Sequence, residues 1–229
     1  MLNNRIDVLK RVFRENIVIF LAMLYITFKL TCNPLFFRQI TISLDFLSLN
    51  LKILSSSLIF SVTYMLSDMI LTVSNRRTAI AIAVIGILSD GVFSFIISFV
   101  SQLPIPSEMM ALQLKNTYAV NQFGSQVWSL FVHGMFATIL SNVAEILIFE
   151  RIFRKIKSFF VSSISSVLLI LLCHNVINDY PMLREQASHW QIIFDGILVN
   201  ISVMVVYALI FSFIIQFRKR INGENNLNK

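Results

Sequence analysis

The sequence predicts an all-α integral membrane protein with a single transmembrane domain, residues 1–229, six transmembrane helices and both termini in the cytoplasm. Three observations predict this class. Apolar residues make up 56% of the chain and charged residues only 14%, which leaves too small a polar shell for a soluble domain. Apolar stretches of about 20 residues recur along the whole length, and Lys and Arg gather in alternate connections between them.

The apolar stretches are each long enough to cross the roughly 30 Å of hydrocarbon in a bilayer. One connection is much longer than the others: residues 101–126 contain Pro104, Pro106 and many polar side chains, so we expect a loop there and regard it as the candidate lid. The spans are expected at residues 16–32, 51–73, 79–100, 127–149, 159–179 and 192–217.

The distribution of positive charge predicts the orientation. Fourteen Lys and Arg residues lie in the N-terminal segment, the 74–78 turn, the 150–158 connection and the C-terminal segment, and Lys29 lies inside the first span. The alternate connections hold only Arg38, Lys52, Lys115 and Arg184. Positive residues favour the cytoplasmic side, so both termini should face the cytoplasm. An error of one span would destroy this alternation, which independently supports six spans.

Several classes of function lack their sequence signatures. There is no Gly-rich phosphate loop, no His-Glu-x-x-His and no Gly-x-Ser-x-Gly, so we do not expect an enzyme. The two cysteines, Cys32 and Cys173, have no ligand or redox spacing, and no metal or cofactor is expected. The net charge of +7 is split into short clusters without a continuous basic face, which argues against nucleic-acid binding.

Polar side chains inside the spans are the candidate functional residues, because a charged group at bilayer depth costs about 2.5–3.5 kcal/mol even on lenient scales. They fall into an inner layer on spans two to four and an outer layer on spans five and six, which we expect to line an outward-facing vestibule. The candidate substrate-binding residues are Asp68, Asp90, Asn142, Glu145, Asn175, Asn178, Asp179 and Asn200.

Structural interpretations compete at several of these positions. Lys29, Asp179 and Asp195 are near enough to a membrane surface to be solvated, and Asp68 and Glu145 can pair with Arg76, Arg77 or Arg151. His133 and His174 can be ordinary packing residues. Polar groups spread over several helices, without a catalytic set, nevertheless favour a small-solute transporter that works by alternating access.

The order of residues resembles the queuosine precursor transporters, also called vitamin uptake transporters. The resemblance begins with Thr63-Tyr64-Met65-Leu66-Ser67-Asp68-Met69-Ile70-Leu71-Thr72-Val73 before Arg76 and Arg77, and continues collinearly through most of the chain. The further similar positions are Asn33, Ser141-Asn142-Val143-Ala144-Glu145 with Ile148-Phe149, Asn175 with Asn178 and Asp179, and Trp190-Gln191-Ile192-Ile193.

The chain departs from the family pattern at polar positions. Thr72 and Asn75 stand in place of an acidic residue and a Gly, and Asn142 and Glu145 in place of a Gln and an Asp. The usual Lys of the last span is replaced near Val199 and Asn200, and the later Thr-Pro is missing. These changes affect the expected substrate more than the expected fold.

The resemblance implies import of 7-cyano-7-deazaguanine, 7-aminomethyl-7-deazaguanine or queuine across a bacterial inner membrane. The N–H donors and carbonyl of such a base match a carboxylate such as Glu145 or Asp68 and an amide such as Asn142 or Asn175. Carboxylates at this depth can also carry protons, so proton-coupled uptake is compatible with the sequence. The expected partners are the lipid bilayer and this small-molecule substrate.

The residues alone leave two other functions open. One is a substrate-binding membrane subunit for another vitamin-like solute, which would work with separate ATPase partners that the sequence does not indicate. The other is a non-transport scaffold whose polar residues serve helix packing.

Overall fold

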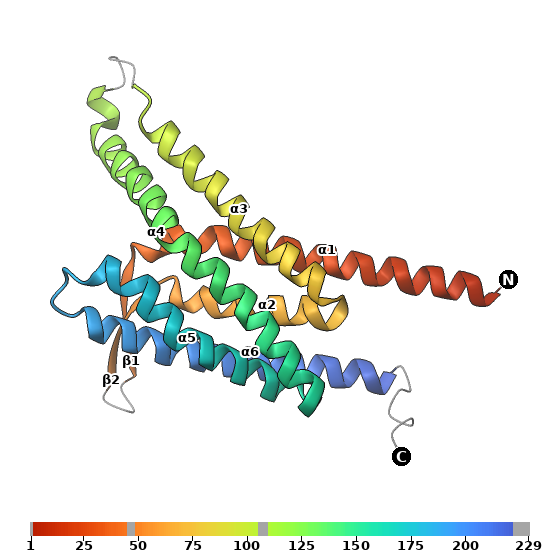
Figure 1. Cartoon of the computed structure of the whole chain (residues 1–229). Coiled ribbons are helices and arrows are strands. Elements are labelled where there is room, and N and C mark those ends of the chain that lie inside the picture. The colour runs from red at the N-terminus through yellow and green to blue at the C-terminus, as the bar shows by residue number, and fades with distance from the viewer. Residues whose placement is uncertain (1, 45–48, 105–109, 222–229) are drawn as a thin grey trace.

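The computed structural model describes residues 2–44, 49–104 and 110–221. Six helices form a bundle, and a two-stranded hairpin lies beside it (Figure 1). In chain order the elements are α1 (Leu2–Phe36), β1 (Gln39–Leu44), β2 (Leu49–Leu54), α2 (Ser57–Val73), α3 (Arg76–Ser101), α4 (Met110–Ile156), α5 (Phe159–Leu183) and α6 (His189–Ile221).

The helices support a multi-pass membrane protein. Five of the six predicted spans lie inside helices, and five helices in the described part of the chain are long and apolar enough to cross a bilayer. The other helix, α2, has 17 residues and is about 26 Å long. Most of its side chains are buried, so α2 forms the centre of the bundle. The number of times the chain crosses the membrane stays a prediction.

Two sequence-based boundaries were wrong. The second span was expected from residue 51, but residues 51–54 belong to β2 and the helix begins only at Ser57. Their apolar side chains alternate with Asn50 and Lys52, a two-residue period typical of a strand. The long connection was expected over residues 101–126, but α4 already begins at Met110. Pro106, which belongs to that expected loop, lies outside the described ranges. Lys229, which belongs to the count of positive charges, lies outside them as well.

The hairpin packs against α6. Its strands pair antiparallel from Gln39 opposite Leu54 to Leu44 opposite Leu49. Leu51 and Ile53 are buried with Val199 of α6, and Ile40 and Ile42 pack on the same cluster. The backbone N–H of Lys52 donates to the Asp195 carboxylate of α6 at 2.8 Å, so Asp195 serves to attach the hairpin.

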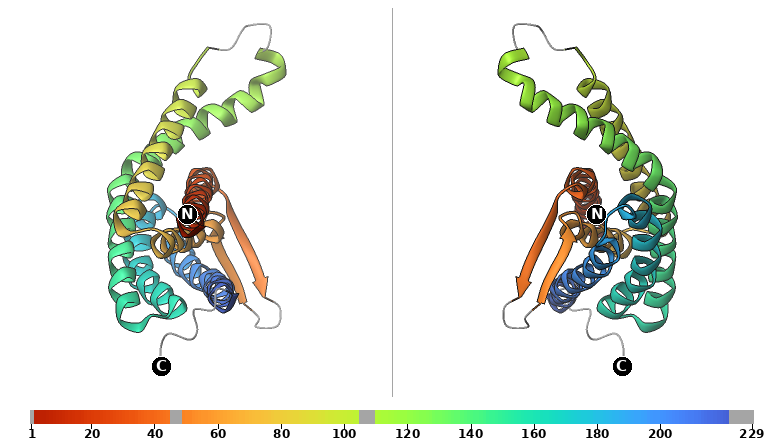
Figure 2. Two further views of the ribbon diagram at one scale, coloured as in Figure 1. Left: turned by 90° about the vertical axis from the view of Figure 1, so that its right-hand side faces the viewer. Right: turned by 90° about the vertical axis from the view of Figure 1, so that its left-hand side faces the viewer.

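The N-terminal end of α1 and the C-terminal end of α6 lie toward the same end of the bundle. Figure 1 shows the α2–α3 and α4–α5 turns at that end too, while the α5–α6 turn and the hairpin lie at the other end. The segments rich in Lys and Arg therefore gather at one end. The pair formed by α3 and α4 extends away from the remaining helices in all three views (Figures 1 and 2), with apolar side chains such as Phe95 and Phe136 exposed to the surroundings.

This arrangement predicts which turns face the cytoplasm. In a background with Cys32→Ala and Cys173→Ala, Glu185→Cys in the α5–α6 turn should react with a membrane-impermeant maleimide in intact cells. Arg77→Cys in the α2–α3 turn should react only after the membrane is permeabilised, because positive residues favour the cytoplasmic side. Labelling of Arg77→Cys in intact cells would reverse the orientation.

Candidate functional site

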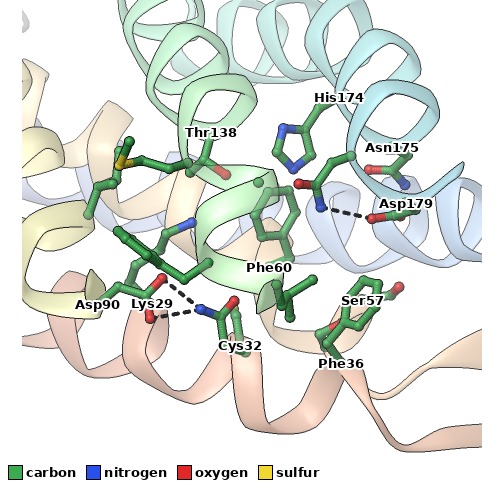
Figure 3. A pocket seen from close by; sticks show the side chains of 18 of the residues that line it. Lys29, Cys32, Phe36, Ser57, Phe60, Asp90, Thr138, His174, Asn175 and Asp179 are labelled. Atoms are coloured by element: carbon green, nitrogen blue, oxygen red, sulfur yellow. Dashed lines mark hydrogen bonds between the residues drawn. The ribbon is translucent and has the colours of Figure 1, made fainter. Parts of the chain in front are cut away.

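A polar pocket lies inside the bundle, between the C-terminal end of α1 and residues of α2, α3, α4, α5 and α6 (Figure 3). The empty space between its side chains is about 630 Å³, including the part open to the surroundings. The polar lining residues are Lys29, Cys32, Asn33, Ser56, Ser57, Asp90, Thr138, His174, Asn175, Asn178, Asp179 and Asn200.

One wall of the pocket joins α1 to α3. Lys29, Cys32, Asn33 and Phe36 follow one another at helical spacing and all line the pocket. The Asn33 side-chain amide donates to both carboxylate oxygens of Asp90, each at 2.9 Å. Asp90 is buried in the middle of α3, so this amide is the contact that holds its carboxylate in the apolar interior.

Lys29 also belongs to this wall. It is only 5% exposed, and its ammonium nitrogen lies 5.3 Å from the centre of the Phe60 ring, within the range of a cation–π contact. The interpretation of Lys29 as a solvated surface residue is therefore wrong: this ammonium group lines the pocket.

The opposite wall comes from α5. Asn175, Asn178 and Asp179 line it, and the Asn178 amide donates to the Asp179 carboxylate at 3.0 Å. His174 stacks on Phe60 with ring centres 4.8 Å apart, and its Nδ1 lies 3.0 Å from the Ser141 hydroxyl. Figure 3 shows Lys29 and Asp90 on one side of Phe60, and Asn175 and Asp179 on the other. A solute between the walls would meet hydrogen-bonding groups from both.

Asn200 closes the pocket from α6. It is 1% exposed, and its side-chain oxygen accepts a hydrogen bond at 2.7 Å from the hydroxyl of Ser61 in α2. The Ser61 hydroxyl is also 3.0 Å from the Asn200 carbonyl oxygen. The side chain of Asn200 therefore ties α2 to α6 and has its amide nitrogen left for other contacts.

The structure separates the predicted site residues into two groups. Asp90, Asn175, Asn178, Asp179 and Asn200 share the pocket, whereas Asp68, Asn142 and Glu145 lie outside its lining. His133 also lies outside: it is exposed, and its ring nitrogen contacts the carbonyl of Ser129 on its own helix at 2.7 Å.

Asp68, Asn142 and Glu145 form a second polar cluster, fully enclosed between helices. Ser67 and Ser166 donate to the two carboxylate oxygens of Glu145 at 2.9 and 3.2 Å, and Ser163 donates to Asp68. The Tyr25 hydroxyl donates to Asn142 at 3.1 Å. Among the described residues no ion pair reaches Asp68 or Glu145, and Arg76 pairs with Glu150 instead.

Some pocket residues were missed or undervalued from sequence. Phe60, Cys32 and Thr138 carried no signal of their own, and Asn33 was noted only through a resemblance. A usable signal was present on α1, where Lys29, Cys32, Asn33 and Phe36 lie on one helical face that faces Asp90.

The described residues contain no group of three His, Cys, Asp or Glu side chains with the geometry to hold a metal ion. The hydrogen-bonding groups of the pocket are amides, hydroxyls, two carboxylates, an imidazole and an ammonium. Such a set suits recognition of a polar molecule that offers both hydrogen-bond donors and acceptors.

Several apolar helices around a partly open polar pocket define a multi-pass membrane protein. The chain belongs to the family described as putative vitamin uptake transporter, whose model matches residues 55–217, more than two thirds of the chain. The family resemblance inferred from the residues is thereby confirmed, and the class is that of a membrane uptake transporter. No curated protein and no solved structure matches the chain.

The contact between Asn33 and Asp90 predicts a stability effect. Asn33→Leu leaves the buried Asp90 carboxylate without its amide donor, which should cost about 1–3 kcal/mol. The measurement is thermal unfolding of the purified protein in detergent. Thr27→Val is the matched control on α1, because the exposed Thr27 hydroxyl bonds only to the Met23 carbonyl of its own helix; equal melting temperatures for both variants would contradict the assigned role.

Proposed function

We propose that this transporter imports a queuosine precursor, namely 7-cyano-7-deazaguanine, 7-aminomethyl-7-deazaguanine or queuine, across a bacterial inner membrane. The observation that carries the proposal is the pocket itself, in which amide and carboxylate groups on α1, α3 and α5 surround a space bordered by aromatic rings. The family match supports uptake, and the chemistry of the pocket supports a base of this kind.

The hydrogen-bonding edge of a 7-deazaguanine base fits such a lining. The base presents adjacent N–H donors and one carbonyl acceptor on one edge, so it needs a carboxylate beside an amide. Asp179 with Asn175 and Asn178 offers this combination on α5, and Asp90 with Asn33 offers it on the facing wall. The flat ring would lie against Phe36, Phe60 or Phe131, which border the same space.

The position of the pocket suits uptake from outside. It lies at the first turn of α2, at the end of α1 and toward the end of α5, all at the end of the bundle away from the termini (Figure 1). With the termini in the cytoplasm, this pocket lies in the outer half of the membrane. A base from outside would then reach it first, and its release inward requires a change of the helix packing.

The substrate is tested by the queuosine content of tRNA in a bacterial strain that cannot make the precursor. The strain expresses this chain and receives each base separately at low concentration. Asp179→Asn should reduce uptake about ten- to hundredfold, because it removes a charge-assisted hydrogen bond worth about 1.5–3 kcal/mol. His133→Gln is the control, because His133 faces away from the pocket.

Absence of queuosine with every base, despite verified membrane insertion, would reject these substrates. Uptake by the purified chain in liposomes, with no other protein present, would exclude the alternative of a binding subunit that needs ATPase partners. Unchanged uptake after Asp179→Asn would reject the placement of the base on α5.

The pocket also predicts a steric effect at Gly134. A Cβ atom added there would lie 2.5 Å from the Asn178 side-chain oxygen, so Gly134→Leu should fill the pocket and abolish uptake. Phe136→Leu on the same helix is the control, since Phe136 is 76% exposed and faces the lipid. In a Cys173→Ala background, which removes the exposed free cysteine, reaction of Cys32 with a small maleimide reports the pocket. This reaction should slow in Gly134→Leu, and an unchanged rate would show that the pocket stays open.

A further inference from the structure

The second polar cluster holds two carboxyl groups in the most enclosed part of the protein. Asp68 on α2 and Glu145 on α4 are both 0% exposed, and they lie within hydrogen-bonding reach of each other. Three serine hydroxyls donate to them, from Ser67, Ser163 and Ser166. In the described part of the chain, no N–H or serine O–H donor reaches one oxygen of Asp68, Oδ1.

This arrangement accommodates a proton better than two negative charges. Two carboxylates in contact repel each other, and such a pair commonly holds one proton between its oxygens. No ion pair in the described part of the chain reaches either group. A shared proton removes one charge and makes the contact between Asp68 and Glu145 a hydrogen bond.

A second feature points to a mobile proton here. The hydroxyl of Tyr64, fully buried on α2, has no hydrogen-bond partner among the described residues. Its ring packs edge-on against Phe60 of the pocket wall at 5.1 Å. Tyr64 stands four residues after Phe60 and four before Asp68, so along α2 it lies between the pocket and the carboxyl pair.

The pocket and the carboxyl pair lie at different positions along the same two helices, α2 and α4. On α2 the pocket residue Phe60 and Asp68 are eight residues apart, about 12 Å along the helix. On α4, Thr138 lines the pocket, its carbonyl accepts from Asn142 at 2.7 Å, and Glu145 follows one turn later. A shift of α2 against α4 would therefore affect both places together.

We propose that Asp68 and Glu145 form a proton-binding site, separate from the substrate pocket, that drives uptake. The pair takes up a proton when the pocket is open to the outside and releases it to the end of the bundle that carries the termini. Loss of the proton leaves two repelling carboxylates on α2 and α4, which changes the packing of helices that also line the pocket. The inference rests on the proposed function because it assigns the energy source of that transport.

The surroundings of the pair contain further titratable groups. Tyr25 of α1 bonds to Asn142 beside the pair, Tyr64 lies next to it on α2, and Tyr207 of α6 packs on the same core clusters. Ser163 and Ser166 are the groups that face it from α5. Tyrosine hydroxyls are neutral near pH 7, so the carboxyl pair is the group that titrates.

The proton itself is measured without any substrate. Infrared spectra of the purified protein at neutral pH should contain the stretching band of a protonated carboxyl group, and this band should be lost or shifted in Asp68→Asn and in Glu145→Gln. Glu150→Gln is the matched control, one turn further along α4, where Glu150 pairs with Arg76 and Arg154. Spectra of Asp68→Asn and Glu145→Gln that equal the wild type in folded protein would overturn the proposal.

Coupling is measured in liposomes with 7-aminomethyl-7-deazaguanine. A pH gradient should drive accumulation by the wild type, and Asp68→Asn and Glu145→Gln should lose accumulation while still exchanging external for internal base. Accumulation that persists in both variants would overturn the proposal. If the wild type exchanges neither this base nor the other two proposed bases, the proposed function is wrong, and the infrared result alone decides the proton site.

Discussion

The structure depends on one constraint: polar groups inside a bilayer must find their partners within the protein, because the hydrocarbon offers none. Many of the deep polar side chains discussed above have such a partner among the described residues. Asn33 supports Asp90, Ser61 supports Asn200, and three serines support Asp68 and Glu145. These contacts connect the helices.

The central helix α2 links the two polar regions. It is short and mostly buried, and it passes from the pocket at Ser57 and Phe60 to the carboxyl pair at Asp68. Its neighbours α4 and α5 also pass both regions, in opposite directions along the bundle (Figure 1). Polar contacts that join α2 to α4, α5 and α6 are therefore concentrated along this helix.

Much of the fold was predictable, and the errors have physical causes. Five spans were located inside helices because long apolar stretches have one stable form in lipid. The hairpin was missed because residues 51–54 are apolar and join directly to an apolar helix, although the alternation with Asn50 and Lys52 was visible. Residues 110–126 were predicted to be a loop because many of their side chains are polar. They belong to α4, which begins before the apolar span does.

The sequence by itself determined the membrane class, the family and the polar side chains that lie within the apolar spans, because length, hydropathy and local motifs are properties of single segments. Only the tertiary structure decided which of these residues meet. Asp90 joined Asn33 and Lys29 at the pocket, while Asp68 and Glu145 met elsewhere. Which side chains come into contact depends on the rotation of each helix about its axis. That rotation is set by packing against all the neighbouring helices together.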